Sequence, residues 1–530
     1  MKKIAAIPLV ETGFLTNLIS DYLTQKSDVN DFYGNFPNLD GFHHQLKHRK
    51  NFDFKKRDEL VKLIQKQHEF LTLSEITQNN IHQLKNENTF TVTTGHQLNL
   101  FSGPLYVIYK LLTTINLVDE LKNKFPENHF VPIYWMATED HDFEEINHFW
   151  VHHQKLQWHK KSGGAVGKYN TDGLDEVFHQ FKNLLKDNPN SEPILNLFEQ
   201  SYLKHTNLSD ANRYLINELF GKFGLVIIDG EDAGLKNQFK TFLVDELINN
   251  TCEKSVILAN TELEKKYKIQ VNPRAINLFY LKDGIRERIV FEEENYKILN
   301  TNFTFSKDEM MQEVEQYPER FSPNVLMRPL YQEVVLPNLC YIGGAGELAY
   351  WLQLKPYFET QKVDFPILLH RNSALILTVK QQQKIQKLGL TLQEILLPLS
   401  DLFHKKVKEI SEHEIDFTKE KLHLELLFKQ LEEITAKTDK SFIGAVKAQH
   451  QKQINGLKNL EKRLIKAEKR KHQAYINQLT NLHLELFPNG ILQERIQNMA
   501  DLLLRNDKAI AELKNQLNPF DFSIDIFQLP

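Results

Sequence analysis

Five short apolar runs lie within about the first 380 residues and alternate with stretches of helical character. Their length and residue types are those of strands buried on both faces of a sheet. The runs are Phe90 to Thr93, Val131 to Met136, Leu225 to Ile228, Leu339 to Ile342 and Pro366 to Leu369. Strands that alternate with helices are typical of a parallel sheet wound with helices. The pattern therefore predicts an α/β fold for this part of the chain.

Two segments inside this region have a different pattern. Residues 151–208 open with a polar, histidine-rich strand pattern and become helical, and residues 268–318 alternate like a small antiparallel sheet. We interpret both as insertions into a sheet domain. That domain is then expected to consist of residues 1–150, 209–267 and 319–380.

Long helices are predicted after Arg371, where Pro and Gly become rare and Lys, Glu, Gln and Leu dominate. Apolar residues step by three and four along two successive helices, which gives each a narrow apolar seam. We expect residues 381–515 to form an α-helical coiled-coil arm, an antiparallel hairpin that pairs with another subunit. The alternative is an ordinary helical bundle packed on its own core. Residues 516–530 are predicted to be a β-like tail that returns to the sheet domain. The seam includes Leu424, Leu427, Leu431, Ile434, Leu457, Leu460 and Leu464.

Composition argues against several classes of protein. The net charge of -4 comes from interspersed Lys and Glu, so no electrostatic footprint for nucleic acid is present. Two cysteines, Cys252 and Cys340, are too few for a disulfide scaffold or a thiolate zinc cage, and they favour the reducing cytoplasm. Because no run reaches about 18 apolar residues, we expect no membrane span.

The first polar motif follows the predicted strand that ends at Thr93. It contains Thr94, Gly95, His96 and Gln97, and a helix is expected to begin near Gly103 and Pro104. A histidine at the end of a strand and beside a helix N-terminus could donate to phosphate or carboxylate oxygens. The alternative is that His96 merely caps the turn.

A cluster of acids follows the second predicted strand, where Glu139, Asp140 and Asp142 flank His141. Like charges this close together cost free energy unless a cation, a proton or a cationic substrate compensates them, so such clusters favour functional sites. Asp142 also fits a capping box with Glu145, which would make it structural. The nearby His148, His152 and His153 match no standard metal motif, and we predict no protein-held metal.

The third constellation begins with Asn324, Arg328 and Gln332 and continues in a glycine turn after the strand 339–342. The forked donors of Arg328 would suit a carboxylate or phosphate; a surface salt bridge is the alternative.

The glycine turn contains Gly343, Gly344, Glu347 and Tyr350, and residues 344–349 fit the G-x-G-x-x-A form of a dinucleotide fingerprint. An NAD-dependent oxidoreductase using residues 343–349 is therefore one alternative function, and a coiled-coil scaffold protein is another. We interpret the glycines as allowing close approach by a substrate, with Glu347 in the cleft.

Together these motifs resemble the bacillithiol-biosynthesis cysteine-adding enzymes, the family called BshC. The resemblance extends over nearly the whole chain. Its residues are Thr94 to Gln97, Leu100 to Tyr106, Trp135, Glu139 to Phe143, Phe321 to Leu326, Arg328, Pro329, Tyr341, Gly343, Gly344, Glu347, Ala349, Tyr350, Pro366, Arg371 and Leu492 to Arg495.

The resemblance implies a Rossmann-like parallel sheet core with two connecting insertions, similar to class I aminoacyl-tRNA synthetases, and a coiled-coil arm that joins a homodimer. It also implies a ligase reaction, the last step of bacillithiol synthesis. In that step the carboxyl group of L-cysteine would be joined to the amine of glucosaminyl-malate.

An ionised carboxylate and an ammonium group do not condense at pH 7, so the acid must be activated, and ATP with Mg is the expected donor. His96 would then steady the leaving group, Asp140 or Glu347 would hold the amine and accept its proton, and Arg328 would bind a carboxylate. The expected catalytic residues are His96, Asp140, His141, Arg328 and Glu347. The expected substrate-binding residues are Thr94, Gly95, Gln97, Gly103, Pro104, Asp142, Asn324, Gln332, Gly343, Gly344, Tyr350 and Arg371.

Overall fold

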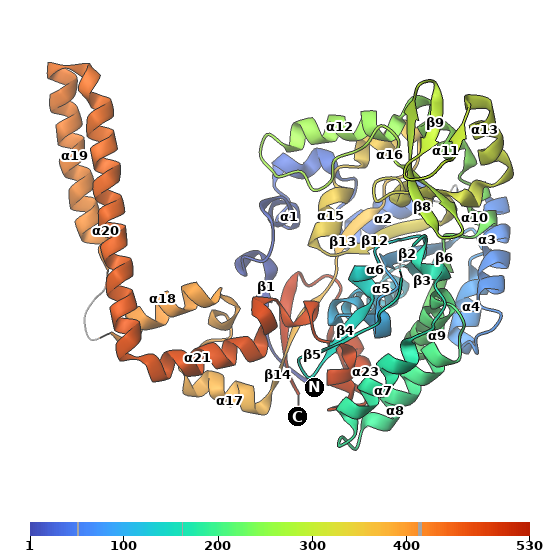
Figure 1. Ribbon diagram of the computed structural model, residues 1–530, viewed down its shortest axis with the longest axis horizontal. Helices are drawn as coiled ribbons and strands as arrows, with labels where there is room; N and C mark the ends of the chain where they lie inside the picture. Colours follow the sequence, from blue (N-terminus) through green and yellow to red (C-terminus); the bar gives the residue numbers. More distant parts are fainter. Residues whose placement is uncertain (50–51, 162, 412–415, 530) are drawn as a thin grey trace. The chain divides into compact units, whose positions relative to one another are not determined.

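The five predicted core strands form one parallel sheet in the computed structural model (Figure 1). If the five strands are numbered as they occur along the chain, their order across the sheet is 5-4-1-2-3. The direction of winding therefore reverses between the first and fourth strands. Open α/β sheets bind their ligands at such a switch point. The strands, from one edge to the other, are β13 (Ile367–His370), β12 (Asn338–Gly343), β2 (Thr89–His96), β3 (His129–Met136) and β6 (Val226–Asp229).

The structure describes residues 1–49, 52–161, 163–411 and 416–529. It divides into two compact units. The first comprises residues 1–377 and 493–530, and the second comprises residues 378–492.

Helices cover both faces of the parallel sheet, which explains its continuous apolar strands. In β3, Val131 and Ile133 join an apolar cluster with α3, whereas Phe130 and Tyr134 join clusters with α5. Helix α5 is buried along most of its length, as its largely apolar sequence requires. The helices of this domain are α1 (Asn17–Leu23), α2 (Leu39–Arg49), α3 (Phe54–Gln67), α4 (Glu75–Gln83), α5 (Leu105–Lys124), α6 (Phe143–Ile146), α9 (Leu208–Phe220), α10 (Ala233–Asn237), α11 (Lys240–Asn249), α12 (Thr251–Leu263), α14 (Arg328–Val335), α15 (Ala345–Trp351) and α16 (Lys355–Gln361).

The two predicted insertions have the expected secondary structure. The first contains most of the hairpin of β4 (His148–Val151) and β5 (Gln154–Gln157), followed by α7 (Leu174–Leu185) and α8 (Ser191–Phe198). The second forms an antiparallel sheet in the order β10-β9-β8-β7-β11. Its elements are β7 (Leu278–Lys282), β8 (Ile285–Glu292), β9 (Asn295–Ile298), β10 (Thr304–Phe305) and α13 (Lys307–Gln316). Strand β11 (Phe321–Pro323), which pairs with β7, lies beyond the predicted end of the insertion at residue 318.

A third sheet joins distant parts of the first unit. Strand β15 (Ser523–Leu529) lies between β1 (Lys2–Pro8) and β14 (Ser373–Thr378). The β-like character predicted for the final segment is therefore present.

Residues 493–515 differ from the predicted extent of the helical arm, because they belong to the first unit. They include α22 (Met499–Leu503) and α23 (Ala509–Gln516). The Asn498 side chain donates hydrogen bonds to the carbonyls of Phe101 and Gly103, at 2.7 and 2.8 Å. A polar helical composition shows that a segment is helical, but not which surface its few apolar residues cover.

The second unit is helical and contains the predicted hairpin. Helices α19 (Thr418–Thr438) and α20 (Ile443–Lys471) lie side by side (Figure 1), and Phe428 stacks on His450 with ring centroids 4.9 Å apart. A small cluster that includes Val407 and Ile465 joins α18 to α20. The remaining helices of this unit are α17 (Val379–Lys387), α18 (Leu399–Ile410) and α21 (Gln473–Leu486).

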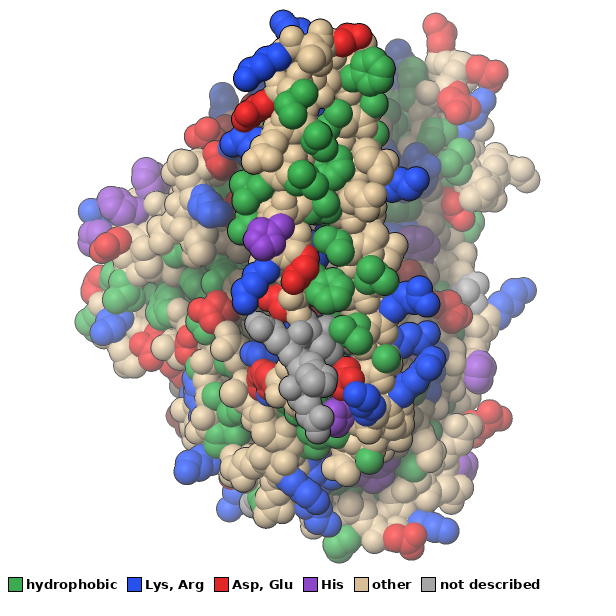
Figure 2. Space-filling model, turned by 90° about the vertical axis from the view of Figure 1, so that its left-hand side faces the viewer, with side chains coloured by type: hydrophobic (Ala, Val, Ile, Leu, Met, Phe, Trp, Pro, Cys, Tyr) green, Lys and Arg blue, Asp and Glu red, His purple; other side chains and the backbone are tan. Residues whose placement is uncertain are grey.

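One face of the hairpin has exposed apolar side chains that no other described residue of the chain covers. Figure 2 shows hydrophobic side chains gathered along it. The exposed apolar residues of α19 and α20 are Leu422, Leu426, Leu427, Leu431, Ile434, Leu460 and Leu464, which are between 39% and 58% exposed.

Two further expectations concern the cysteines and membranes. Cys252 and Cys340 are both buried free thiols, and they form no disulfide. No helix among the described residues is both long and apolar enough to span a bilayer.

Candidate active site

A cavity of about 720 Å³ lies at the carboxyl ends of the parallel strands, beside the switch point between β2 and β12. Four side chains from distant parts of the sequence line it. His96 ends β2, Asp140 follows β3, Arg328 begins α14 and Glu347 lies in the first turn of α15. The side chains that we expected to share a pocket therefore do share one.

Six of the predicted substrate-binding residues also line this cavity: Gly95, Gln97, Asn324, Gly344, Tyr350 and Arg371. The other six, together with His141, lie outside its lining: Thr94, Gly103, Pro104, Asp142, Gln332 and Gly343.

Local partners explain the positions of the outlying residues. The Thr94 hydroxyl donates to the Ile342 carbonyl inside the sheet, at 2.9 Å. Asp142 caps α6, the structural alternative given by its spacing to Glu145. Gly103 has a φ of +61°, and a Cβ there would lie 2.6 Å from the Cβ of Asn99, so only glycine fits this turn.

Gly343, Pro104, His141 and Gln332 also have structural partners. The Gly343 carbonyl accepts a hydrogen bond from the Arg371 amide, and Pro104 is the residue that precedes α5. His141 is exposed and contacts Arg286, while Gln332 is fully buried behind the cavity wall. The sequence could not separate residues that contact the cavity from residues that support it.

His96 is neutral at physiological pH. Burial, together with the nearby positive charge of Lys110, lowers its pKa to about 3. Its Nε2 atom is buried and has no hydrogen-bond partner among the described residues. The Tyr106 ring meets the imidazole edge-on, with centroids 5.3 Å apart. A neutral imidazole can donate one hydrogen bond and accept another, but it offers no positive charge.

Asp140 is held as a carboxylate. Burial acts to raise its pKa, yet contacts with His141, Gln97 and the positive charge of Arg286 together hold the pKa well below its usual range. Gln97 Nε2 donates to Oδ2 at 2.7 Å, and the His141 amide donates to Oδ1 at 2.7 Å. Asp140 is therefore suited to attract a cation rather than to take up a proton.

Glu347 is paired with a buried lysine that the sequence analysis missed. Lys110 Nζ lies 2.9 Å from both Glu347 carboxylate oxygens and 2.5 Å from the Gly95 carbonyl. The Tyr341 hydroxyl and the Gly344 amide donate to the same carboxylate, at 2.6 and 2.9 Å. Burial raises the pKa of Glu347, but these contacts outweigh it and lower the pKa to about 2.

The Lys110–Glu347 pair also bears on the glycine turn. Because the Glu347 carboxylate accepts the Gly344 N–H at the start of α15, this donor is already used inside the protein. In a dinucleotide-binding turn the corresponding amides face a pyrophosphate. The contact therefore argues against an NAD site at residues 343–349.

Arg328 retains an unused donor at the cavity wall. Its Nη1 donates to Gln332 Oε1 at 3.0 Å, and the guanidinium carbon lies 5.6 Å from the centre of the Tyr341 ring. Its Nη2 is buried without a hydrogen-bond partner in the described part of the chain. A buried, unpaired guanidinium nitrogen is costly unless an anion completes it.

Sequence models of one family match the chain over almost its entire length. The model described as "Bacillithiol biosynthesis BshC, N-terminal Rossmann-like domain" matches residues 2–372, and "Bacillithiol biosynthesis BshC, C-terminal coiled-coil domain" matches residues 374–529. The chain belongs to the BshC family. Both the Rossmann-like core and the helical hairpin agree with these descriptions.

Curated relatives named "Putative cysteine ligase BshC" span the same length. The relative from Flavobacterium psychrophilum is 50% identical over 522 residues, which cover 98% of each chain. The relative from Flavobacterium johnsoniae is 48% identical and also covers 98% of each chain. The relative from Bacillus mycoides is 30% identical and covers 92% of this chain and 93% of its own.

Arg371 of this BshC chain is committed to an internal partner. Its Nη1 and Nη2 donate to the two carboxylate oxygens of Glu494 at 3.1 and 2.7 Å, and both side chains are at most 4% exposed. Arg371 lines the cavity, but both of its terminal guanidinium nitrogens already donate to Glu494. The role predicted from its resemblance to other BshC sequences is therefore limited to the remaining Nε edge.

The second insertion of this BshC chain contributes cations that the sequence analysis missed. Arg286 from β8 lies over the Phe279 ring at 4.0 Å, contacts His141 Nδ1 at 2.6 Å and donates to the Ser322 hydroxyl. Like Arg328, it hydrogen-bonds to neutral groups, although its charge also interacts with the Asp140 carboxylate. Arg274 and Arg495 also line the cavity. Sequence periodicity does not show how the insertion packs over the core, so its arginines could not be assigned to the cavity. Lys110 could have been found, because it is a charged residue within an apolar helix.

Proposed function

We propose that this protein is a cysteine ligase of bacillithiol biosynthesis, joining the carboxyl group of L-cysteine to the amine of glucosaminyl-malate. The observation that carries the proposal is the convergence of His96, Asp140, Arg328 and Glu347 on one cavity of a BshC-family chain. The names of the relatives support the reaction class. A cavity of about 720 Å³ also falls within the usual range of small-molecule sites.

We propose ATP, delivered with Mg²⁺, as the source of carboxylate activation. The unpaired Arg328 Nη2 and the unpaired ring nitrogen of His96 are groups that an oxygen-rich ligand could complete. No cluster of three or more His, Cys, Asp or Glu suited to a metal is found among the described residues. Mg²⁺ commonly binds through substrate phosphates and few protein ligands, so here the phosphates of ATP would supply most of its ligands.

The pKa values refine the roles proposed from chemistry. Arg328 would bind a carboxylate or phosphate, and neutral His96 would donate a hydrogen bond to the leaving group. Asp140 would hold the ammonium group of the amine substrate as a permanent anion. Glu347, already paired with Lys110, would shape the turn after β12 instead of accepting a proton.

A reconstituted reaction tests the proposal. Purified protein is incubated with L-cysteine, glucosaminyl-malate and ATP with Mg²⁺, and mass spectrometry should show a thiol whose mass is the sum of the two substrates less one water. Arg328→Met should lower kcat/KM at least about 10-fold, the loss of a hydrogen bond to a charged group. Arg463→Met, on the exposed surface of α20, is the matched control.

Two outcomes would contradict the ligase. One is the absence of product with every nucleotide. The other is retention of bacillithiol production by His96→Ala and Arg328→Met together with its loss on deletion of residues 422–479, which would favour a scaffold protein.

We also propose that the protein is a cytoplasmic homodimer joined through the arm. The apolar face of α19 and α20, with side chains such as Leu431 and Leu464 about 40% exposed, supports pairing with a second copy (Figure 2). The two buried free thiols fit a reducing compartment.

A further inference from the structure

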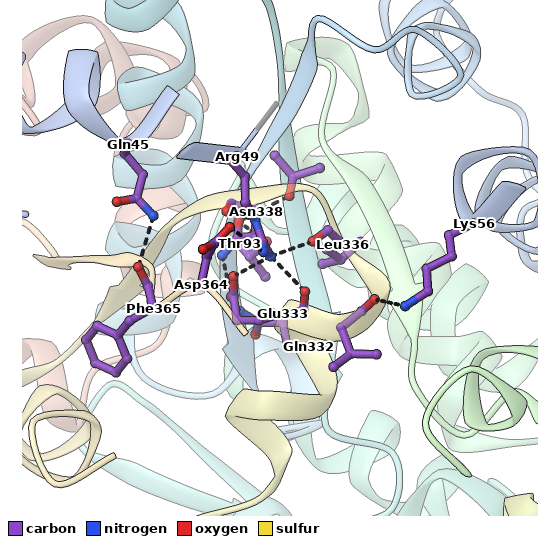
Figure 3. A network of polar contacts seen from close by, with 12 residues as sticks. Gln45, Arg49, Lys56, Thr93, Gln332, Glu333, Leu336, Asn338, Asp364 and Phe365 are labelled. Carbon is purple, nitrogen blue, oxygen red and sulfur yellow. Dashed lines mark hydrogen bonds and ion pairs between the residues drawn. The ribbon is translucent and has the colours of Figure 1, made fainter. Parts of the chain in front are cut away.

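A buried polar network surrounds Glu333 (Figure 3). One of its members, the Gln332 amide, also contacts Arg328 at the cavity wall. Glu333, which is 1% exposed, is its centre. Gln332 Nε2 and Asn338 Nδ2 donate to Glu333 Oε1 at 2.8 and 2.7 Å, and Arg49 Nη2 lies 3.2 Å from Oε2. Gln332 Oε1 then accepts the hydrogen bond from Arg328 Nη1.

The Glu333 Oε1 atom fixes which way the Gln332 amide points. This oxygen accepts hydrogen bonds from the NH₂ groups of both Gln332 and Asn338, so the Gln332 amide turns its NH₂ group toward Glu333. Its oxygen is then directed at Arg328. Gln332 is 0% exposed, so water cannot readily substitute for either partner.

Arg49 anchors the carboxylate from the other side. Its guanidinium also donates to the carbonyls of Glu333, Leu336 and Asn338, at 2.7, 3.1 and 3.0 Å. Burial raises the pKa of Glu333 to about 7, and Arg49 is the main group that opposes this increase. Figure 3 shows Arg49 and Gln332 reaching the Glu333 region from different elements, so the network is held from several sides.

We propose that Gln332, oriented by Glu333, is a positioning residue that holds the Arg328 guanidinium with Nη1 engaged and Nη2 free for an anionic substrate group. The role of Arg328 as the anion clamp rests on the proposed function. The positioning itself does not. Gln332 acts through Arg328, since it lies outside the cavity lining.

A double-mutant cycle tests whether Gln332 acts through Arg328. Binding of glucosaminyl-malate is measured by titration calorimetry for the wild type, Gln332→Leu, Arg328→Met and the double variant. Gln332→Leu should weaken binding about 10-fold. The double variant should match Arg328→Met within about twofold, because the positioned group is gone. Additive losses, or unchanged binding by Gln332→Leu, would overturn the proposal.

Control variants separate positioning from general damage. Gln45→Leu removes another buried glutamine, whose Nε2 donates to the Phe365 carbonyl away from Arg328, and should leave binding within about twofold. Glu333→Gln should retain most binding, since an amide oxygen can still accept from Gln332. A loss in Gln45→Leu equal to that in Gln332→Leu would count against positioning.

A crystal structure of Gln332→Leu distinguishes this proposal from the proposed function. If the wild type binds no glucosaminyl-malate but the Arg328 guanidinium moves in the variant, the ligase proposal fails and the positioning role stands. An Arg328 side chain that keeps its place in Gln332→Leu would refute the positioning role whatever the ligand result.

Discussion

The ionisable side chains around the cavity differ in their surroundings, and these differences set their charges. His96 is half-buried near a cation and stays neutral, while Glu347, also half-buried, is paired with Lys110 and stays ionised. Asp140 keeps its charge through amide donors and Arg286. The site thus combines a neutral imidazole with fixed anions and with Arg328, which hydrogen-bonds to a neutral amide.

The low pKa of His96 is directly measurable. Its ring carbon chemical shift should stay flat in an NMR titration from pH 8 to pH 5, with His96→Asn used to assign the signal. Because the folded pKa of about 3 lies below the unfolded value of about 6.5, the unfolded chain takes up this proton first. His96 therefore reduces stability progressively as the pH falls from about 6.5 toward 3. A titration midpoint between pH 6 and 7 would contradict this account.

Replacing Lys110 should strongly destabilise the protein. Lys110→Met leaves the Glu347 carboxylate and the Gly95 carbonyl without their cation, which should cost about 3 kcal/mol in the free energy of unfolding measured with urea. Lys124→Met, at the exposed end of the same helix, should change it by less than about 0.5 kcal/mol. Adding Glu347→Gln to Lys110→Met should recover part of the loss; a purely additive loss would rule out the pairing.

At the scale of elements, the sequence predicted the strands well because their signal is local. All five apolar runs became strands of the parallel sheet, and the two insertions took the expected secondary structure. The incorrect predictions concern polar side chains whose hydrogen-bond partners could not be inferred from the sequence. Gln332 is adjacent to its partner Glu333, and Arg371 lies 123 residues from Glu494, but neither pairing has a periodic signature. Both therefore resembled substrate-binding residues.

The exposed face of the arm should control dimer formation. Leu431→Glu and Leu464→Glu each place a charge in that face, and each should weaken association about 10- to 100-fold, the equivalent of losing one buried leucine. Sedimentation velocity measures the change, and circular dichroism should show unchanged helicity. Lys452→Glu, also exposed on α20, is the control. Dimers that persist in both leucine variants would exclude this face as the interface.

At the scale of the whole molecule, the segment after residue 492 completes the first unit. Glu494 is the buried partner of Arg371, so Glu494→Gln should lower the free energy of unfolding by about 3 kcal/mol because a buried charge loses its counterion. Urea unfolding followed by tryptophan fluorescence would measure this. Glu485→Gln, in an exposed pair with Lys384, should cost less than about 1 kcal/mol. Equal losses in the two variants would show that burial of the pair is unimportant.

The position of β15 between β1 and β14 has a consequence for synthesis of the chain. Strand β1 is synthesised long before its partner at residues 523–529, and at about 5–20 residues per second the delay between the two is roughly 25 to 100 s. An unpaired strand edge invites aggregation during that interval. Nascent chains of this protein should therefore depend on chaperones until residues 523–529 have been synthesised.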